Sequence, residues 1–420
     1  MIRPLIVTIV ALLPAMTGAQ ADQNRSTAQL DMEIGVWAAR TERDPDDYIS
    51  PTRLGYARLR KARIAGDFRE YAAAEAALTE ALKRQPDHYT ALLGLGTARS
   101  ARHRFADAIV LGMKAAVIQP DDPDAYALIG DANLGLGDLD RAQAAYAELE
   151  KRAPGFDADT RRANLLQARG KSREAIALLR AALSDATPKG LPAESRSWCQ
   201  VMIGATLFDL GDWDAAEPEY QAALKLTRDS YVAIEHLAEL RSYQRRDKEA
   251  LALYDRAIAL APHPDFFEAV ARTHEWAGRS DEAKRWHVRA RDGYLDAVKA
   301  GDPGYYRNLA MYFTDVEPKP DEAVAWARKD LELRQDHAAW SALAWALLGK
   351  GDIAGARDAS AKATASDAED AGMWFRAGMI EKAAGNTAGA RAALQRALAI
   401  NSKFDRAAEA RKLLEILNRK

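Results

Sequence analysis

The sequence predicts an all-α protein, folded as a solenoid of stacked helical hairpins. Its central stretch repeats itself, because residues 89–122 and 123–155 carry the same residue types in the same order, 34 positions apart. The matching pairs are Leu95 with Ile129, Gly96 with Gly130, Ala108 with Ala142, and Pro120 with Pro154. A repeat of this length is typical of a two-helix unit that buries its apolar face only against its neighbours.

One alanine marks the start of the second half of each unit. It recurs at Ala74, Ala108, Ala142, Ala175, Ala216, Ala250, Ala283, Ala323, Ala356 and Ala390. Two intervals exceed the period by about seven residues, close to two helical turns, so a hairpin can lengthen there and keep its apolar face inward. We predict about ten units, at 48–88, 89–122, 123–155, 156–196, 197–230, 231–263, 264–303, 304–336, 337–370 and 371–404.

The order of residues within the units resembles the tetratricopeptide repeat. Two units show it best, with Tyr126, Ile129, Gly130, Ala142, Tyr146 and Pro154 in one and Trp340, Leu343, Ala344, Leu347, Gly351 and Ala356 in the other. Residues 159–168 make a poor first helix, and four units lack the closing proline, at Arg228, Gln335, Ala368 and Ser402. The resemblance implies a right-handed superhelix that holds a protein partner.

The first 21 residues are typical of an export signal. Arg3 gives a basic start, residues 5–13 form an apolar run too short to span a bilayer, and residues 19–21 offer small side chains for cleavage. The alternative, an uncleaved anchor, is disfavoured by the short run. No cysteine stands directly after the run, where a lipid would be attached, so we expect no lipid anchor. We therefore expect a mature chain from near Asp22, located in the bacterial periplasm, with secretion as the second possibility.

Two helices are expected to cover the ends of the array. The N-terminal segment, residues 22–47, contains a helix at 28–43 with apolar residues at helical spacing. At the other end, residues 405–420 form an amphipathic capping helix. Its apolar stripe consists of Ala410, Leu413, Leu414 and Leu417. Without such caps, the terminal units would expose their apolar sides.

The composition narrows the classes of partner. Charged residues make up 29% of the chain and its formal net charge is -2, without a cluster of Lys and Arg, so nothing favours nucleic acid as a partner. No second apolar run is long enough to span a membrane after the signal. Cys199 is the only cysteine, so an internal disulfide is excluded, although pairing between chains would allow self-association. We predict that Cys199 is a small buried helix residue.

No motif for catalysis, cofactor binding or metal binding is evident. The seven histidines form no HExxH pair, and no Gly-rich phosphate loop follows a strand. His274 and His287 deserve comparison, since they stand where this repeat usually places aromatic residues against each other. A zinc site needs three or four ligands, and no third accompanies them. We predict a structural role, with a metal or pH-sensing site as the alternative, and no catalytic residue.

The resemblance also implies which residues line the binding groove. In the tetratricopeptide repeat, five positions of each first helix point to the concave side. Those positions hold Trp198, Phe208, Glu235, Glu239, Tyr243, Glu268, Arg272, Glu275, Trp276, Tyr305, Asn308, Tyr312, Trp345 and Phe375. The groove would be aromatic and acidic, which suits an extended peptide of basic or proline-rich character. The alternative is that a shift of one residue in helix phase places some of these aromatic side chains in the hairpin core, as expected for Trp340 and Trp374.

Two functions remain open at this stage. The first is a noncatalytic scaffold or adaptor in the periplasm that holds a protein partner. The second is the binding or processing of cell-wall or exported polysaccharide, which stacked aromatic and acidic side chains also serve. A defined protein captured from a lysate would favour the first, and tryptophan fluorescence quenched by oligosaccharide would favour the second.

Overall fold

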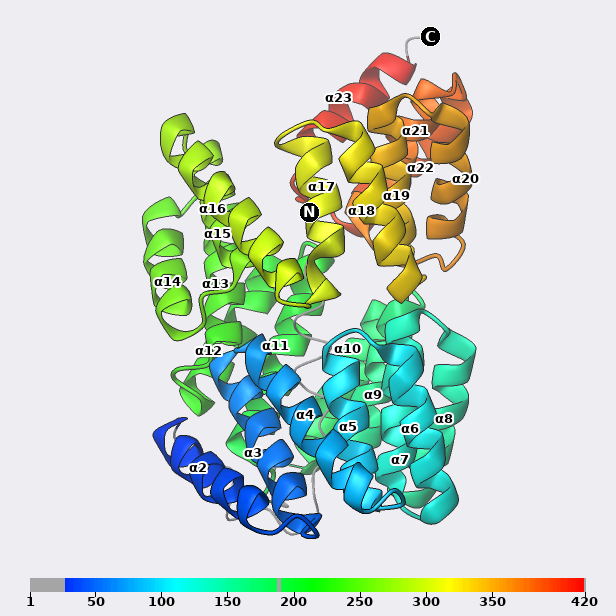
Figure 1. Cartoon of the computed structure of the whole chain (residues 1–420). Helices are drawn as coiled ribbons and strands as arrows, with labels where there is room; N and C mark the ends of the chain where they lie inside the picture. Colours follow the sequence, from blue (N-terminus) through cyan, green and yellow to red (C-terminus); the bar gives the residue numbers. More distant parts are fainter. Residues whose placement is uncertain (1–26, 187–189, 419–420) are drawn as a thin grey trace. The chain divides into compact units, whose positions relative to one another are not determined.

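A computed structural model describes residues 27–186 and 190–418 of the chain (Figure 1). These residues form 22 α-helices and one short 3-10 helix, and no strand occurs among them. The all-α fold predicted from the repeat is therefore confirmed. The export signal predicted at 1–21 lies outside the described residues.

The helices follow one another with short connections. Their bounds are α2 (Thr27–Arg43), α3 (Ile49–Ala65), α4 (Phe68–Arg84), α5 (Tyr89–Ala101), α6 (Phe105–Ile118), α7 (Pro123–Leu136), α8 (Leu139–Arg152), α9 (Phe156–Ala168), α10 (Ser172–Ala186), α11 (Ala193–Asp209), α12 (Trp213–Leu226), α13 (Tyr231–Tyr243), α14 (Asp247–Leu260), α15 (Pro264–Trp276), α16 (Ser280–Lys299), η2 (Pro303–Tyr305), α17 (Tyr306–Asp315), α18 (Pro320–Leu333), α19 (His337–Lys350), α20 (Ile353–Thr364), α21 (Ala371–Ala383), α22 (Thr387–Ile400) and α23 (Ala407–Asn418). Consecutive helices from α3–α4 to α21–α22 pair as hairpins, the arrangement expected of a repeat array.

The chain divides into two compact units. Of the described residues, the N-terminal unit contains those up to 165 together with 182–186 and 190–192, and the C-terminal unit contains 166–181 together with 193–418. The division falls in α9 and α10. Residues 159–168, which the sequence marks as a poor first helix, lie at this division.

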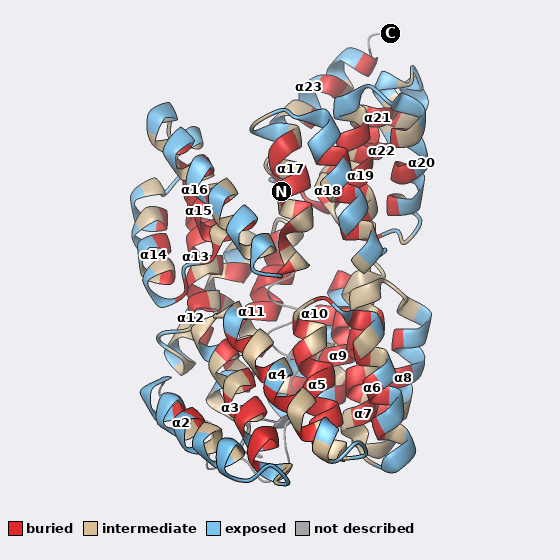
Figure 2. Cartoon of the chain, viewed as in Figure 1, coloured by how far each residue is buried: buried red, intermediate tan, exposed pale blue. Residues whose placement is uncertain are grey.

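The recurring alanines hold the hairpins together. All ten are buried, none more than 2% exposed. In both units, buried residues line the helix faces that meet neighbouring helices (Figure 2). Size complementarity sets the spacing, since a Cβ added at Gly130 would lie 2.3 Å from the ring of Tyr146, and one at Gly204 would lie 2.6 Å from the ring of Tyr220. A glycine on the first helix therefore makes room for a tyrosine on the second.

The turns within the hairpins have the expected chemistry. Gly137 ends α7 in the left-handed conformation at φ 87°, which costs a glycine little. The Asp138 carboxylate then accepts a hydrogen bond from the Arg141 amide at 3.1 Å and caps α8. Asp352 caps α20 in the same way, at 2.9 Å from the Gly355 amide.

The long repeat intervals correspond to longer elements. The interval of 40 residues contains α16, which has 20 residues where α14 has 14. The extension buries Tyr294 against Tyr305, with the two ring centroids 5.3 Å apart. The added turns therefore extend the core instead of forming a loop.

Both predicted caps are present. In α2, the buried Ile34 packs with Leu54 of α3, next to the partly buried Trp37. At the other end, Leu413 and Leu417 of α23 are buried in one core cluster with residues of α21 and α22. These helices cover apolar faces that the last hairpin at each end would otherwise expose.

Cys199 has the structural role predicted for it. Its side chain is buried in α11, and the thiol lies 3.6 Å from the carbonyl oxygen of Leu179. Burial raises the pKa of this thiol to about 12, with a smaller contribution from the negative charge of Glu219. A thiol held protonated in this way is a poor nucleophile.

Candidate binding face

All fourteen residues predicted to line a binding groove belong to the C-terminal unit. They lie on α11, α13, α15, α17, α19 and α21 and at the end of η2. The helices α11, α13 and α15 contact one another in sequence, as do α17, α19 and α21. The first helices of successive hairpins are therefore neighbours, which brings residues 34 positions apart to adjacent places.

Four aromatic side chains form a continuous chain across three hairpins. We call Phe208, Trp213, Tyr243 and Trp276 the aromatic ladder. The ring of Tyr243 meets the rings of Phe208 and Trp276 edge-on, with centroid distances of 5.0 Å and 4.9 Å. Trp213 stacks on Phe208 at 6.2 Å and lies 5.9 Å from Tyr243. Each such pair contributes about 0.5–1.5 kcal/mol beyond its buried area, so the rings are held in place before any partner binds.

The outer rings of the ladder each carry a cation. The guanidinium carbon of Arg245 lies 5.1 Å from the ring centroid of Trp276. The Lys403 ammonium lies 4.9 Å from the ring centroid of Trp213. Trp213, Tyr243 and Trp276 are all partly exposed. The ladder therefore offers aromatic faces of a kind that attracts cations.

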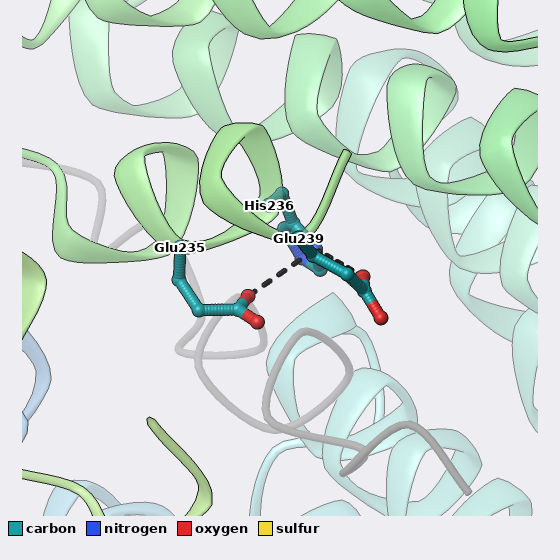
Figure 3. Close-up of side chains that lie close together, drawn as sticks. All are labelled: Glu235, His236 and Glu239. Carbon is teal, nitrogen blue, oxygen red and sulfur yellow. Dashed lines mark ion pairs between the residues drawn. The ribbon is translucent and has the colours of Figure 1, made fainter. Parts of the chain in front are cut away.

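Glu235, His236 and Glu239 form a cluster of ionisable side chains on α13 (Figure 3). The His236 Nδ1 atom lies 3.3 Å from a carboxylate oxygen of Glu235 and 3.9 Å from one of Glu239. The His236 ring stacks on Tyr220, with centroids 5.7 Å apart and planes 10° apart. Glu239 is one helical turn before Tyr243, so the cluster and the ladder are neighbours on this helix.

The α13 cluster offers three possible ligand atoms within 4.8 Å of one another. Three protein ligands are the minimum of a catalytic zinc site, which keeps a fourth position open. A protonated His236 would instead balance the charge of one carboxylate without an ion. Without a bound ion, Glu235 and Glu239 make this part of the face acidic.

The next first helix, α15, continues the acidic character. Glu268 lies 3.4 Å from the guanidinium of Arg272, one helical turn away. Glu275 shares a hydrogen bond of 2.9 Å with the Nε2 atom of His287. This hydrogen bond lowers the pKa of Glu275 against the opposing effect of burial, and the charges of His287 and Arg272 lower it further. Glu275 therefore presents a negative charge next to Trp276.

Asp265, at the start of α15, has a different state. The side chain is 8% exposed, and its Oδ1 atom accepts a hydrogen bond of 2.6 Å from the Asn308 amide. The Tyr294 hydroxyl lies 3.1 Å from the same oxygen and 2.6 Å from a Glu268 oxygen. The pKa of Asp265 is raised to about 8, mainly by burial. The charge of Glu268 also raises it, and this effect is larger than the lowering by the Tyr294 hydrogen bond. A pKa of about 8 favours the protonated form of this carboxyl group at neutral pH.

The predicted residues differ in exposure. Glu275 is exposed, and the partly exposed residues are Trp198, Glu235, Tyr243, Glu268, Arg272, Trp276, Asn308 and Trp345. The buried residues are Phe208, Glu239, Tyr305, Tyr312 and Phe375. Tyr305 and Tyr312 belong to a core cluster between hairpins, and Phe375 belongs to the core that α23 covers. These three aromatic side chains therefore lie in the core, as the alternative interpretation of the sequence expected.

The structure brings some of the predicted residues together and separates others. Phe208, Tyr243 and Trp276 meet in the ladder. Trp345 has a different environment on α19, where its indole nitrogen donates to Asp315 at 2.8 Å. Trp213 is not among the predicted residues, because it begins a second helix and the predicted groove positions lie on first helices. The signal that would have revealed it is the turn at Gly211, which places the next aromatic residue beside the end of α11.

His274 and His287 have separate partners. The Nδ1 atom of His274 accepts a hydrogen bond of 2.8 Å from Arg279, whereas His287 bonds to Glu275. Burial lowers the pKa of His274, and the charge of Arg279 lowers it further. His236, which the sequence did not single out, is the histidine that has two carboxylates beside it.

The fold and the repeated hairpins define the class: an all-α repeat protein assembled from two-helix units. The profile described as Tetratricopeptide repeat matches residues 59–125, 127–190, 201–264 and 341–405. These matches cover more than half of the chain, which belongs to the tetratricopeptide repeat family. Proteins of this family are generally noncatalytic scaffolds with protein partners. None of the helices in the described ranges has the length and hydropathy to cross a membrane.

Solved structures show distant likenesses. Human IFIT1 in its dimer with PPP-AAAA is 14% identical, with 90% of this chain and 96% of that chain covered and a TM-score of 0.47. Pseudomonas aeruginosa PilF is 18% identical, with 53% and 97% covered and a TM-score of 0.39. Yeast Tom70 is 14% identical, with 93% of each chain covered and a TM-score of 0.42. A comparison with curated proteins finds no match. Such low identities and TM-scores carry no argument about what this chain binds.

Proposed function

We propose that the protein is a noncatalytic interaction scaffold that holds an extended protein segment on the aromatic ladder and the acidic side chains beside it. The observation that carries this proposal is the ladder itself, in which three partly exposed rings from successive hairpins are fixed by one another. Aromatic side chains have few rotors to freeze and dominate binding hot spots. Rings that fix one another in this way lose little freedom when a partner binds.

The charges next to the ladder favour a basic segment. Glu235 and Glu239 lie on α13, and Glu268 and Glu275 lie on α15. Arg272 is the only cation among the predicted residues, and Glu268 lies 3.4 Å from its guanidinium. A segment with Lys or Arg gains both from the carboxylates and from the faces of the rings. Proline residues suit the same face, because aromatic-lined grooves recognise extended proline-rich segments.

The compartment that we propose is the bacterial periplasm. The support is the export signal predicted at residues 1–21 from its basic start, short apolar run and small cleavage residues. Fractionation of the native host and N-terminal sequencing of the purified protein test the proposal. We expect a periplasmic protein that begins near Asp22. A chain that keeps Met1 and stays in the cytoplasm would contradict it.

Removing one ring from the ladder tests the binding face. We expect Trp276→Ala to weaken the capture of a partner from a periplasmic extract by tenfold or more, since truncation of an aromatic hot spot costs about 2 kcal/mol. The matched control is Trp326→Ala on α18. This ring is also partly exposed, and it lies 4.3 Å from the Lys329 ammonium, much as Trp276 lies near Arg245.

The control separates loss of the face from general damage. Capture should be unchanged in Trp326→Ala, and both variants should keep the helical circular dichroism of the wild type. Equal capture by Trp276→Ala and the wild type would exclude the ladder as the binding site. Oligosaccharide that quenches tryptophan fluorescence in the wild type and not in Trp276→Ala would instead support a polysaccharide ligand on the same rings.

A further inference from the structure

The loop between α22 and α23, residues 401–406, lies against the aromatic ladder. The Asn401 side-chain amide donates a hydrogen bond of 3.4 Å to the carbonyl oxygen of Phe208, a member of the ladder. Its own Oδ1 atom accepts a hydrogen bond of 2.8 Å from the amide of Lys403. A Cβ at Gly211 would lie 2.5 Å from that Oδ1 atom, so the turn after α11 admits the loop only with glycine.

An equivalent contact occurs one repeat earlier, also within the C-terminal unit. Gly170 and Gly211 end α9 and α11 at equivalent positions, both with positive φ. Asp367 is 34 residues before Asn401, and a Cβ on Gly170 would lie 2.3 Å from the Asp367 carbonyl oxygen. A Glu369 carboxylate oxygen also accepts a hydrogen bond of 3.0 Å from the amide of Ser172. Two equivalent loops thus dock on two equivalent turns, which shows that the docking follows the register of the repeat.

The loop brings its own cations to the face. Lys403, whose side chain is otherwise exposed, places its ammonium 4.9 Å from the ring centroid of Trp213. The positive charge of Arg406 acts on Glu275, and the negative charge of Asp405 acts on Arg272. The charges of the loop are therefore opposite to those of the residues they influence on α15.

We propose that the side chain of Lys403 in this loop is an internal occupant of the binding face, and that the partner is an extended basic segment whose cation displaces it from the ring of Trp213. This inference rests on the proposed function and gives its partner a chemistry. The segment carries one cation for the face of Trp213, as Lys403 does, and a second for the acidic side chains beside the ladder.

A tethered occupant competes with every external ligand. Because the loop is part of the chain, its effective concentration at the face is high, and removing one of its contacts makes the face more available. An exposed cation–π contact is worth about 0.5–1 kcal/mol, so loss of the Lys403 ammonium should tighten the binding of a basic peptide about two- to fivefold.

The test uses two fluorescent peptides and the full mature chain. One peptide has the sequence of residues 399–408, and the other has Glu in place of Lys403 and Arg406. Fluorescence anisotropy gives the Kd of each peptide with the wild type, Lys403→Ala, Lys403→Glu and the control Lys412→Glu. Lys412 is an exposed residue of α23, and its variant carries the same charge change away from the loop.

We expect the basic peptide to bind Lys403→Ala and Lys403→Glu more tightly than the wild type, with Lys412→Glu unchanged and the acidic peptide bound by none. Equal affinity in Lys403→Glu and Lys412→Glu, or equal binding of the two peptides, would overturn the inference. If partner capture still depends on Trp276, the proposed function survives such a result. If it does not, both are wrong.

Discussion

Two buried aspartates, one in each unit, differ in the side chains that surround them. In the N-terminal unit, Asp131 of α7 lies 3.0 Å from the Arg161 guanidinium, and both side chains are 4% exposed. The Tyr146 hydroxyl donates a second hydrogen bond at 2.9 Å. In the C-terminal unit, Asp265 has a tyrosine hydroxyl and an asparagine amide as partners, and an acidic residue, Glu268, as its charged neighbour.

The difference appears in the pKa values. Burial raises the pKa of Asp131 to about 6, because the positive charge of Arg161 offsets part of the desolvation. Burial raises the pKa of Asp265 to about 8, and the nearby Glu268 adds to the effect. At neutral pH these values favour the ionised form of Asp131 and the protonated form of Asp265.

This comparison separates a carboxylate held in a structural ion pair from a buried acid whose strongest charged neighbour is another acid. An ion pair such as that of Asp131 and Arg161 fixes α7, α8 and α9 against one another and leaves nothing for a ligand. Asp265 and Glu268 instead concentrate acidic groups at the start of α15, the helix that carries Trp276. Carboxyl groups gathered without a sufficient cation are destabilising, which is common where a protein keeps a surface for binding.

The largest expected effect comes from removing the cation of the first pair. Arg161→Met leaves Asp131 buried without its cation, which should cost about 3–5 kcal/mol of unfolding free energy at neutral pH. The loss should shrink at pH 5, since Asp131 can then take up a proton. Denaturant titration followed by circular dichroism measures both.

A neighbouring arginine provides the control for this prediction. Arg162 is 41% exposed and pairs with Glu150 at 2.6 Å, so Arg162→Met should cost less than about 1 kcal/mol. If Arg161→Met proved as mild as Arg162→Met, the pair would not be the structural element that its burial indicates.

The same isosteric change should have opposite signs at the two aspartates. The pKa of the Asp265 carboxyl group is higher in the folded protein, at about 8, than its ordinary value of 3.8. Its contribution to stability is therefore fully present at low pH, and it is lost as the pH rises from 3.8 to about 8. Asp265→Asn, which mimics the protonated acid, should therefore raise the unfolding free energy at pH 8 and change it little at pH 4. The wild-type slope can reach about 1.4 kcal/mol per pH unit in this window.

Asp131→Asn should instead destabilise the protein, because it leaves the Arg161 charge buried without a carboxylate. Thermal melts of both variants at about pH 4, 6 and 8 measure the contrast over the range in which the two carboxyl groups titrate. A decrease in stability at pH 8 for Asp265→Asn would show that Asp265 is ionised in the folded protein.

A smaller effect is expected from the two tyrosines that bond to these acids. Tyr146→Phe and Tyr294→Phe each remove a hydroxyl and keep the ring, so each should cost about 1 kcal/mol. The Tyr294 variant should lose more at pH 8 than at pH 5, because the hydroxyl helps to solvate a carboxylate that forms only at higher pH. Denaturation midpoints at the two pH values check this. Equal losses at both would argue against it.

Much of the fold could be predicted from the sequence. The recurring alanines gave the hairpins, and the apolar stripe that includes Leu413 and Leu417 gave the C-terminal cap, because both patterns depend on local periodicity. The division into two units could not be predicted, since it depends on how well α9 and α10 pack. One trace of it in the sequence is the weak first helix at 159–168.

The binding face was accessible in part. Position in the repeat was enough to bring Phe208, Tyr243 and Trp276 together, because each lies on a first helix. The same rule also selected Tyr305 and Phe375, whose side chains turn into the core, since helix phase cannot be fixed to one residue from periodicity alone. Lys403 could not be found in this way, because its contact with Trp213 joins residues that are far apart in the sequence.

The smallest expected effect concerns an exposed pair, and it shows whether burial is what makes the first comparison meaningful. The Arg69 guanidinium lies 2.8 Å from the Asp67 carboxylate, but its side chain is 86% exposed. Water and salt screen this pair, so Arg69→Ala should change the unfolding free energy by less than about 0.5 kcal/mol. The Asp67 carboxylate still accepts from the amide of residue 69 at 3.0 Å and caps α4. Thermal melts at low and high salt measure the change. A loss comparable to that of Arg161→Met would mean that ion pairs stabilise this array irrespective of burial, and the contrast between Asp131 and Asp265 would need another cause.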